Sequence, residues 1–266
     1  MGEQNIEESV QESFKNLSRG LMQPSYPEAY EAYKELYEIG PSVIPIIKSK
    51  ILETDWSNSK YKELSNYISG LFSLLHDLDE DEAKFVCEKI IANGCPKHIK
   101  AILKSVFEFS LKNYTRYQIM GLDIFEHKLV EAKCNIASYL ERWLSNVPES
   151  DLKEISRLYV INRKKINASG TYTPVLKVIA LLWENQYKEK SLSFKFFALY
   201  TEKVLYHEIG HHTHRHNFGT EPDQEKEADQ YAFKIMKNSH PHLAHFLRIL
   251  SKLGIKSNRN YYRWGL

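Results

Sequence analysis

The sequence lacks a large excess of charge of one sign, a long apolar run and a paired set of cysteines. Lysine and arginine number 36 against 34 aspartate and glutamate residues, which leaves a formal net charge of +2. A protein that neutralises nucleic-acid phosphates needs a marked basic excess on one face, so this balance argues against a nucleic-acid partner. No stretch reaches the roughly 18 consecutive apolar residues of a membrane-spanning helix, so no membrane partner is expected either.

Targeting signals and disulfide patterns are also missing. The first twelve residues, MGEQNIEESVQE, contain four glutamates and lack the basic and apolar segments of a signal peptide. Cys87, Cys95 and Cys134 form an odd set, which is untypical of a disulfide-stabilised secreted domain. We therefore expect buried thiols in a soluble, cytoplasmic protein.

Helical patterns follow one another through the first part of the chain. Apolar residues recur at helical spacing in Tyr26–Gly40 and again in Ser42–Leu52, with Gly40-Pro41 between them. Further helices are expected near Tyr61–His76, Asp81–Ile91 and Lys97–Leu111. The segment EAYKELYEIGPSVIPIIKSKIL resembles one HEAT repeat over about 25 residues. A plain helical bundle is the alternative to a repeat array.

The pattern breaks around Asn113–Asp123, and we place a domain boundary there. The prediction is a helical, possibly HEAT-like, module over residues 1–122 and a second domain over residues 123–266. In the second domain, Leu129–Leu144 again has a helical pattern. Leu158–Ile161 and Val175–Trp183 are expected to be strands, separated by turn residues at Asn167–Gly170. The predicted fold class is mainly α (α+β), with a small sheet.

Histidines are concentrated near the end of the chain. Of 11 histidines, eight lie between His207 and His245. The helix expected at Ser193–Thr213 is apolar almost all round in its first half, which predicts a buried helix that carries histidines into the interior. Within it, His207-Glu208-Ile209-Gly210-His211 fits the pattern H-E-x-x-H.

The spacing of this motif has a chemical reason. Residues four apart lie one turn above each other, so the imidazoles of His207 and His211 can converge on one Zn²⁺ ion. Glu208 lies about 100° round the helix and can serve as a general base toward activated water. A metzincin continuation is absent, because His214 and Asn217 stand where its glycine and histidine would be.

A second helix is expected at Glu225–Lys237, and it carries Glu225-Lys-Glu-Ala-Asp229-Gln-Tyr-Ala. Glu225 and Asp229 are four residues apart and share a face. A catalytic zinc site uses three protein ligands. One of these two carboxylates can therefore ligate zinc while the other orients a ligand histidine.

H-E-x-x-H followed by E-x-x-A-D-x-(F/Y)-A resembles the gluzincin zinc metallopeptidases. The pattern is most similar to the ImmA/IrrE-like group, and the site is also similar to that of the membrane-embedded HtpX-like peptidases. The resemblance covers roughly Ser150–Lys237. It implies a minimal zincin domain with His207, His211 and Glu225 as zinc ligands. It also implies Glu208 as general base and acid, with Asp229 supporting a ligand from outside the metal.

The resemblance further implies that an edge strand near Thr173–Leu182 holds an extended peptide by strand addition. The helical N-terminal half departs from the compact ImmA/IrrE-like proteins, and no helix-turn-helix pattern is evident. We expect this half to recruit or gate a peptide or protein substrate, or to bind a protein partner.

These observations predict a zinc-dependent metallopeptidase. The first alternative is a non-catalytic helical scaffold or binding protein with an inert or structural zinc site. Glu208 argues against it, because a structural site has no use for a base beside the metal. A zinc hydrolase acting on something other than peptides is a third hypothesis.

The donor that stabilises the oxyanion stays open in the sequence. Candidates are Tyr172, His212, His214, Tyr231, Tyr261, Tyr262 and Arg263. His212, His214 and His216 are interpreted as a solvated helix end, and Tyr231 as a packing residue. His240, His242 and His245 are interpreted as polar surface.

Overall fold

The computed structural model describes residues 3–22, 26–55, 62–162, 169–174, 176–183, 191–216 and 221–242. The chain divides into two compact units, Met1–Lys112 and Asn113–Leu266. The division lies at the start of the segment in which the helical pattern breaks, whereas the boundary drawn from the sequence follows residue 122.

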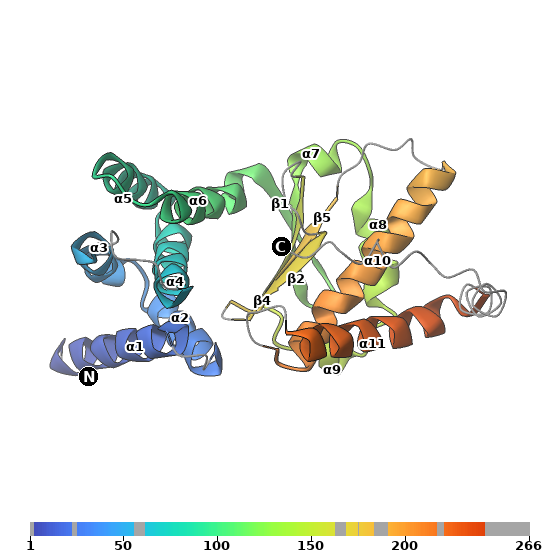
Figure 1. Ribbon diagram of the computed structural model, residues 1–266, viewed down its shortest axis with the longest axis horizontal. Coiled ribbons are helices and arrows are strands. Elements are labelled where there is room, and N and C mark those ends of the chain that lie inside the picture. Colours follow the sequence, from blue (N-terminus) through green and yellow to red (C-terminus); the bar gives the residue numbers. More distant parts are fainter. Residues whose placement is uncertain are drawn as a thin grey trace. The chain divides into compact units, whose positions relative to one another are not determined.

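Six α-helices and three short 3₁₀ turns make up the described part of the first unit (Figure 1). They are α1 (Glu3–Met22), α2 (Tyr26–Ile39), η1 (Gly40–Val43), α3 (Ile44–Glu53), α4 (Lys62–Leu78), α5 (Glu80–Ala92), α6 (Lys97–Val106), η3 (Phe107–Phe109) and η4 (Leu111–Asn113). Helix α4 contacts all five other α-helices. In a repeat array each unit touches only its neighbours, so this central helix is the arrangement of a bundle.

Local signals in the sequence set the ends of these helices. Gly40 adopts a φ of 81°, which glycine reaches without steric cost, and this lets the chain turn from α2 toward α3. Asp79 precedes α5, and its carboxylate accepts a hydrogen bond from the Glu82 backbone N–H at 2.9 Å. Phe72 and Leu75 of α4 are fully buried, so the bundle is held by an apolar centre.

The second unit contains a five-stranded mixed sheet with the strand order β1-β2-β3-β5-β4. The strands are β1 (Tyr114–Ile119), β2 (Leu122–His127), β3 (Arg157–Ile161), β4 (Gly170–Thr173) and β5 (Val178–Leu182). Strands β2, β3 and β5 are parallel, and β1 and β4 pair antiparallel at the two edges. Met120 and Gly121 join β1 to β2 with φ values of 52° and 80°. Positive φ at both central positions gives the twist that a tight hairpin needs.

Several details of this sheet differ from the sequence-based expectations. The β1–β2 hairpin occupies the segment that has no clear period in the sequence. The strand expected at Val175–Trp183 is shorter, and it lies inside the sheet, paired with β3 on one side and β4 on the other. The prediction of an edge strand at Thr173–Leu182 is therefore wrong, because the edge on that side is β4.

The helix expected at Leu129–Leu144 is divided in two. Helix α7 (Lys128–Glu131) ends before α8 (Ile136–Leu144) begins, and the Asn135 side chain caps α8 by accepting from the Ser138 backbone N–H at 3.3 Å. A capping asparagine starts a new helix because it satisfies a backbone donor that has no intrahelical partner. A short helix, α9 (Glu149–Leu152), follows.

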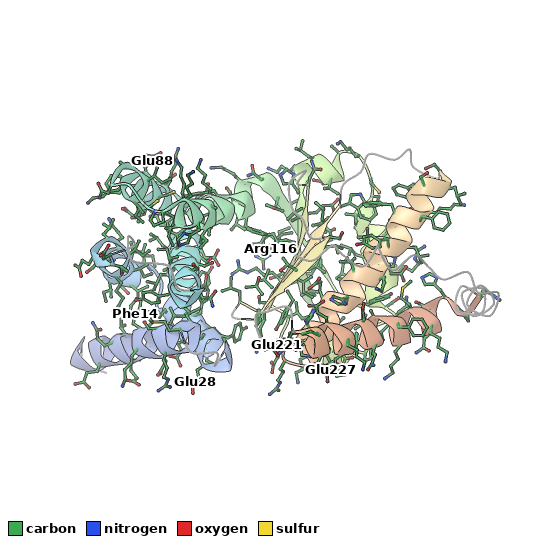
Figure 2. The ribbon with its side chains drawn as sticks, viewed as in Figure 1. Phe14, Glu28, Glu88, Arg116, Glu221 and Glu227 are labelled. Carbon is green, nitrogen blue, oxygen red and sulfur yellow. The ribbon has the colours of Figure 1, made fainter. Side chains whose placement is uncertain are left out.

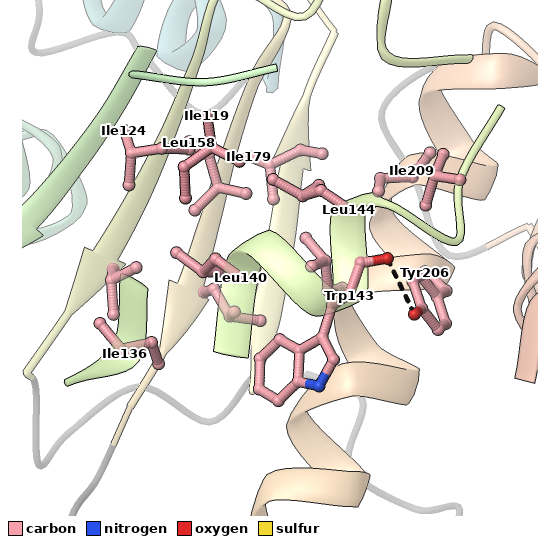
Figure 3. Close-up of a cluster of buried hydrophobic side chains, with 14 of the residues drawn as sticks. Ile119, Ile124, Ile136, Leu140, Trp143, Leu144, Leu158, Ile179, Tyr206 and Ile209 are labelled. Carbon is pink, nitrogen blue, oxygen red and sulfur yellow. Dashed lines mark hydrogen bonds between the residues drawn. The ribbon is translucent and has the colours of Figure 1, made fainter. Parts of the chain in front are cut away.

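The two helices of the predicted metal motif are α10 (Leu192–Thr213) and α11 (Pro222–Ser239). Figure 3 shows Trp143 and Leu144 of α8 between the sheet and the Tyr206 and Ile209 side chains of α10. The Tyr206 hydroxyl donates a hydrogen bond to the Trp143 carbonyl oxygen at 3.0 Å, which ties α10 to α8. The core of the second unit thus fixes α10 against the sheet.

The first half of α10 is more exposed than its composition suggests. Leu192 is 70% exposed and Phe196 is 62% exposed, and Tyr200 one turn later is also exposed. These residues recur every four positions, so they form one outward stripe while Phe194 and Ala198 face the core. The prediction that this half is buried on every side is wrong.

The mainly helical α+β class predicted from the sequence is confirmed. Within the described ranges, no helix combines the length and the apolar character that crossing a membrane requires. Cys87 and Cys134 are buried, and Cys95 is half-buried.

Candidate metal centre

Helix α10 is anchored at both ends by side-chain or backbone caps. The Ser191 hydroxyl accepts a hydrogen bond from the Phe194 backbone N–H at 3.1 Å. At the other end, the Arg215 N–H donates to the His212 carbonyl oxygen at 3.0 Å, and the His216 N–H donates to the His211 carbonyl oxygen at 2.9 Å. Together with the φ of 55° at Arg215, this is a Schellman motif, which turns the chain back over the last helical turn.

Three predicted ligand side chains converge from α10 and α11. The Nε2 atoms of His207 and His211 lie 3.0 Å apart. The carboxylate of Glu225 approaches both rings, with Oε2 at 3.4 Å from the His207 Nε2 and Oε1 at 3.5 Å from the His211 Nε2. His207, His211 and Glu225 are thus arranged as a group that could hold a metal ion.

These separations fit one tetrahedral zinc ion. With zinc–ligand distances of about 2.0–2.2 Å, the ligand atoms of a tetrahedral site lie roughly 3.3 Å from each other. The 3.0 Å between the two imidazole nitrogens, and the 3.4 and 3.5 Å from these nitrogens to the two carboxylate oxygens of Glu225, lie around that value. Two imidazoles and one carboxylate are also a donor set that catalytic zinc sites use.

Glu225 of α11 reaches the two histidines of α10 because the two helices approach closely at Gly210. A Cβ atom on Gly210 would lie 3.0 Å from the Ala228 Cα and 3.1 Å from the Ala228 carbonyl oxygen. Both are backbone atoms, so they cannot rotate away. Glycine in mid-helix costs roughly 1 kcal/mol relative to alanine, and the close contact gives a reason for tolerating that cost.

Asp229 contacts the far side of one ligand ring. Its Oδ1 lies 3.2 Å from the His207 Nδ1 and also accepts a hydrogen bond from the Lys203 Nζ at 2.9 Å. The hydrogen bond with His207 lowers the pKa of Asp229 to about 2, and Lys203 lowers it further while partial burial opposes this. Burial lowers the pKa of His207, but its hydrogen bond to the Asp229 carboxylate and the nearby charges of Glu208, Asp229 and Glu225 raise the pKa overall. An ionised Asp229 therefore faces the ring nitrogen opposite the ligand atom.

Glu208 lies beside the cluster, packed under the edge strand. A Cβ on Gly170 of β4 would lie 2.5 Å from the Val204 Cγ1 and 3.0 Å from the Glu208 Oε1, so a larger residue at this position would have to displace side chains of α10. The Tyr172 backbone N–H donates a hydrogen bond to the Glu208 carboxylate. Burial raises the pKa of Glu208 to about 7, with His207 and the Tyr172 N–H opposing the rise and Glu225 adding to it. This carboxyl therefore binds a proton much more strongly than a solvent-exposed glutamate does.

His216 contacts His211, and the sequence analysis did not predict this contact. His216 is 5% exposed, its Nδ1 lies 2.8 Å from the His211 Nδ1, and its Nε2 lies 2.9 Å from the Glu227 Oε2. The pKa of His211 falls to about 3 because the ring is desolvated and faces the His207 and His216 rings. The interpretation of His216 as a solvated residue is wrong, since the Schellman motif folds it back over His211.

The interpretation of His212 as solvated is wrong as well, because its ring is buried between two partners. Its Nε2 lies 2.9 Å from the Lys153 carbonyl oxygen, and its Nδ1 lies 3.0 Å from the Tyr172 hydroxyl. Burial lowers the pKa of His212. Of the three histidines expected at a solvated helix end, His214 is the exposed one.

The remaining residues that the sequence singled out have other partners, are exposed or lie outside the described residues. The buried Tyr231 donates its hydroxyl to the Asp151 Oδ2 at 2.7 Å, so it packs and bonds on the side of α9. His240 lies 2.9 Å from the buried carboxylate of Glu202, and His242 is exposed. Tyr261, Tyr262, Arg263 and His245 lie outside the described residues.

Comparisons of the chain with protein-family models, with curated proteins and with solved structures find no match.

Proposed function

We propose that the protein is a zinc-dependent metallopeptidase of the gluzincin type, similar in its site to ImmA/IrrE-like peptidases. His207, His211 and Glu225 hold the zinc ion, and Glu208 moves protons. The observation that carries the proposal is the convergence of the His207, His211 and Glu225 side chains, whose possible ligand atoms all lie within 4.8 Å of one another, beside the buried carboxylate of Glu208.

The number of ligands supports a catalytic rather than a structural site. Structural zinc sites are closed by four protein ligands, whereas catalytic sites use three and leave a position open. The described residues offer a group of three at this place. Burying a glutamate next to such a group lowers stability, and a purely structural site has no use for the residue. The buried Glu208 therefore favours a catalytic site.

When bound, a zinc ion supplies Lewis-acid activation of water and of the scissile carbonyl. Glu208 accepts the proton of the attacking water and then donates it to the leaving nitrogen. A carboxyl with a pKa near 7 is suited to both transfers at neutral pH. The Tyr172 N–H keeps the carboxylate turned toward β4, and Asp229 fixes the His207 ring.

The edge strand β4 supports an extended peptide as the substrate. The Leu182 N–H donates to the Ser169 carbonyl oxygen, and Thr171 pairs with Ala180. Because hydrogen-bonded pairs alternate in an antiparallel ladder, the backbone groups of Gly170 point away from β5, whereas the outward N–H of Tyr172 is already bonded to the Glu208 carboxylate. A peptide that adds to this edge would pass next to Glu208. Strand β4 therefore takes the peptide-binding role that the sequence analysis gave to Thr173–Leu182.

We assign substrate recruitment or partner binding to the first unit, and we assign the cytoplasm as the compartment on the basis of cysteine usage. Both belong to the proposal.

Zinc content and peptide cleavage test the proposed function together. We expect one zinc per chain in the wild type and loss of zinc in His211→Ala. Glu208→Gln should keep the zinc and lower the rate of cleavage of a peptide library by about 10²- to 10⁴-fold, since general acid–base catalysis contributes that much. His214→Ala is the matched control, because His214 is exposed at the end of the same helix.

Two results would count against the proposal. Wild-type activity in Glu208→Gln would show that the mechanism is wrong. Zinc binding without cleavage of any peptide under any condition would favour the non-catalytic binding protein.

A further inference from the structure

The two ligand histidines of α10 are held by different outer groups. His207 meets the carboxylate of Asp229 directly, at 3.2 Å from its Nδ1. His211 meets a carboxylate only through a second imidazole, since His216 lies between it and Glu227. Glu227 and Asp229 both come from α11, so one helix supports both ligands of the other.

The two hydrogen bonds that link His211, His216 and Glu227 run in one direction. With the Glu227 carboxylate as the acceptor of its hydrogen bond with His216, the His216 Nε2 is the donor. In a neutral imidazole the other nitrogen is then an acceptor, so the His216 Nδ1 accepts from the His211 Nδ1. This leaves the His211 Nε2 without a proton, which is the form that ligates a metal.

The position of His216 follows from the helix cap. Residues five apart do not share a face of an α-helix, so His211 and His216 would not meet on a straight helix. The left-handed Arg215 and the hydrogen bond from the His216 N–H to the His211 carbonyl oxygen bring the two rings together. His216 is 5% exposed, whereas the Glu227 side chain is 58% exposed, so the buried ring links the ligand to a carboxylate at the surface.

We propose that His216 and Glu227 are positioning residues that hold His211 in its zinc-binding tautomer and orientation. The inference rests on the proposed function, because it concerns how one ligand of that centre is held.

The test measures metal affinity rather than activity. Zinc-free protein is titrated with Zn²⁺ against a chelator of known affinity. His216→Leu should weaken zinc binding by about 10- to 100-fold, the range typical of losing a group that supports a ligand, and Glu227→Gln by about tenfold. His216→Gln should recover most of the loss, because its amide can accept from His211 and donate to Glu227.

Two control variants separate this role from loss of charge or of local structure. Glu221→Gln removes an exposed carboxylate just before α11, and Figure 2 labels both Glu221 and Glu227. His214→Leu removes an exposed imidazole whose ring centre lies 5.5 Å from that of His216. Both should bind zinc within about twofold of the wild type, since neither residue bonds to His211.

Cobalt substitution gives a readout that a structural role would not move. The visible absorption of the Co²⁺ protein should shift in His216→Leu and return toward the wild-type spectrum in His216→Gln, because the donor strength of His211 changes with its partner. The thermal unfolding of the zinc-free variants shows whether they are folded. If His216→Leu does not fold, the affinity of Glu227→Gln decides, since Glu227 is largely exposed.

The outcomes distinguish this inference from the proposed function. Wild-type zinc affinity in a folded His216→Leu and in Glu227→Gln would overturn the inference and leave the proposed function standing. A wild-type protein that binds no zinc would overturn both.

Discussion

The two units differ in architecture and in the side chains that they bury, since the described part of the first is a bundle of helices and the second combines helices with a five-stranded sheet. Among the residues that the structure describes, the buried polar ones of the first unit are Ser13, His76 and Ser110. Those of the second are Glu126, Thr201, Glu202, Glu208, His212 and His216. Four of these six lie on α10.

Burying a charged group lowers stability unless the group is hydrogen-bonded and paired, so buried titratable side chains are expected to have such partners. On α10, Glu202 is bonded to Tyr206 and His240, and His212 to Lys153 and Tyr172. The first unit is thus organised around apolar packing, whereas helix α10 of the second unit is organised around titratable groups. Such concentrations mark candidate functional sites.

Removing a buried ring from the first unit tests whether its core is purely structural. Phe72→Ala should lower the free energy of unfolding by about 3–5 kcal/mol, because the side chain is fully buried and leaves a cavity. Zinc affinity should stay within about threefold of the wild type, since Phe72 lies in the other unit. Urea denaturation measures the first quantity and chelator competition the second. A large fall in zinc affinity would contradict the view that the core of the first unit is purely structural.

A pair of glycine substitutions sharpens the difference between the units. Gly210→Ala should cost about 1–3 kcal/mol, since the new methyl group meets the backbone of Ala228 and forces α10 and α11 apart. Because Glu225 moves with α11, zinc affinity should fall as well.

Gly70→Ala in α4 is the matched substitution in the first unit. Its methyl group would meet the Leu21 Cδ1, the end of a flexible side chain, and alanine improves helix propensity. We expect a smaller change in stability and unchanged zinc affinity, measured as for Gly210→Ala. Equal effects of the two substitutions on zinc affinity would contradict the close-contact explanation.

The smallest expected effect concerns Glu126, a buried carboxyl outside the candidate metal centre. Burial raises the pKa of Glu126, while the hydrogen bond from the Tyr117 hydroxyl at 2.8 Å opposes the rise. The folded state then binds this proton more tightly than the unfolded state, so stability falls as the pH rises from about 4.3, the ordinary glutamate value, through the raised pKa.

Glu126→Gln should remove this part of the pH dependence. Urea denaturation of both proteins at several pH values from 4 to 8 measures it. If the difference in stability between the two proteins is independent of pH, Glu126 titrates normally in the folded protein.

The helical half of the fold and the two motif helices could be predicted because periodic apolar residues and short caps signal them locally. His207, Glu208 and His211 are candidates because of their spacing on one helix, and Glu225 and Asp229 because of theirs on the next. The choice of Glu225 as the ligand depends on the family resemblance. The hairpin of β1 and β2 was missed because Glu126, a charged residue, occupies an inward position and spoils the alternation.

Two further expectations were wrong because they depend on features that neighbouring residues in the sequence do not reveal. One feature is strand pairing between distant segments, and the other is an unusual backbone conformation. Strand order is set by pairing between distant segments, so the interior place of β5 could not be predicted from its own residues. His216 was missed because the left-handed position that turns the chain is occupied by Arg215 rather than by the glycine that usually signals such a cap.

The left-handed Arg215 predicts which substitutions this position tolerates. Its side chain is exposed, so the requirement at this position is a backbone shape rather than a chemical group. Glycine, asparagine and aspartate reach that shape readily, whereas β-branched residues and proline do not. In a library of all substitutions, position 215 should therefore sort amino acids by their φ preference, with charge and size of little importance.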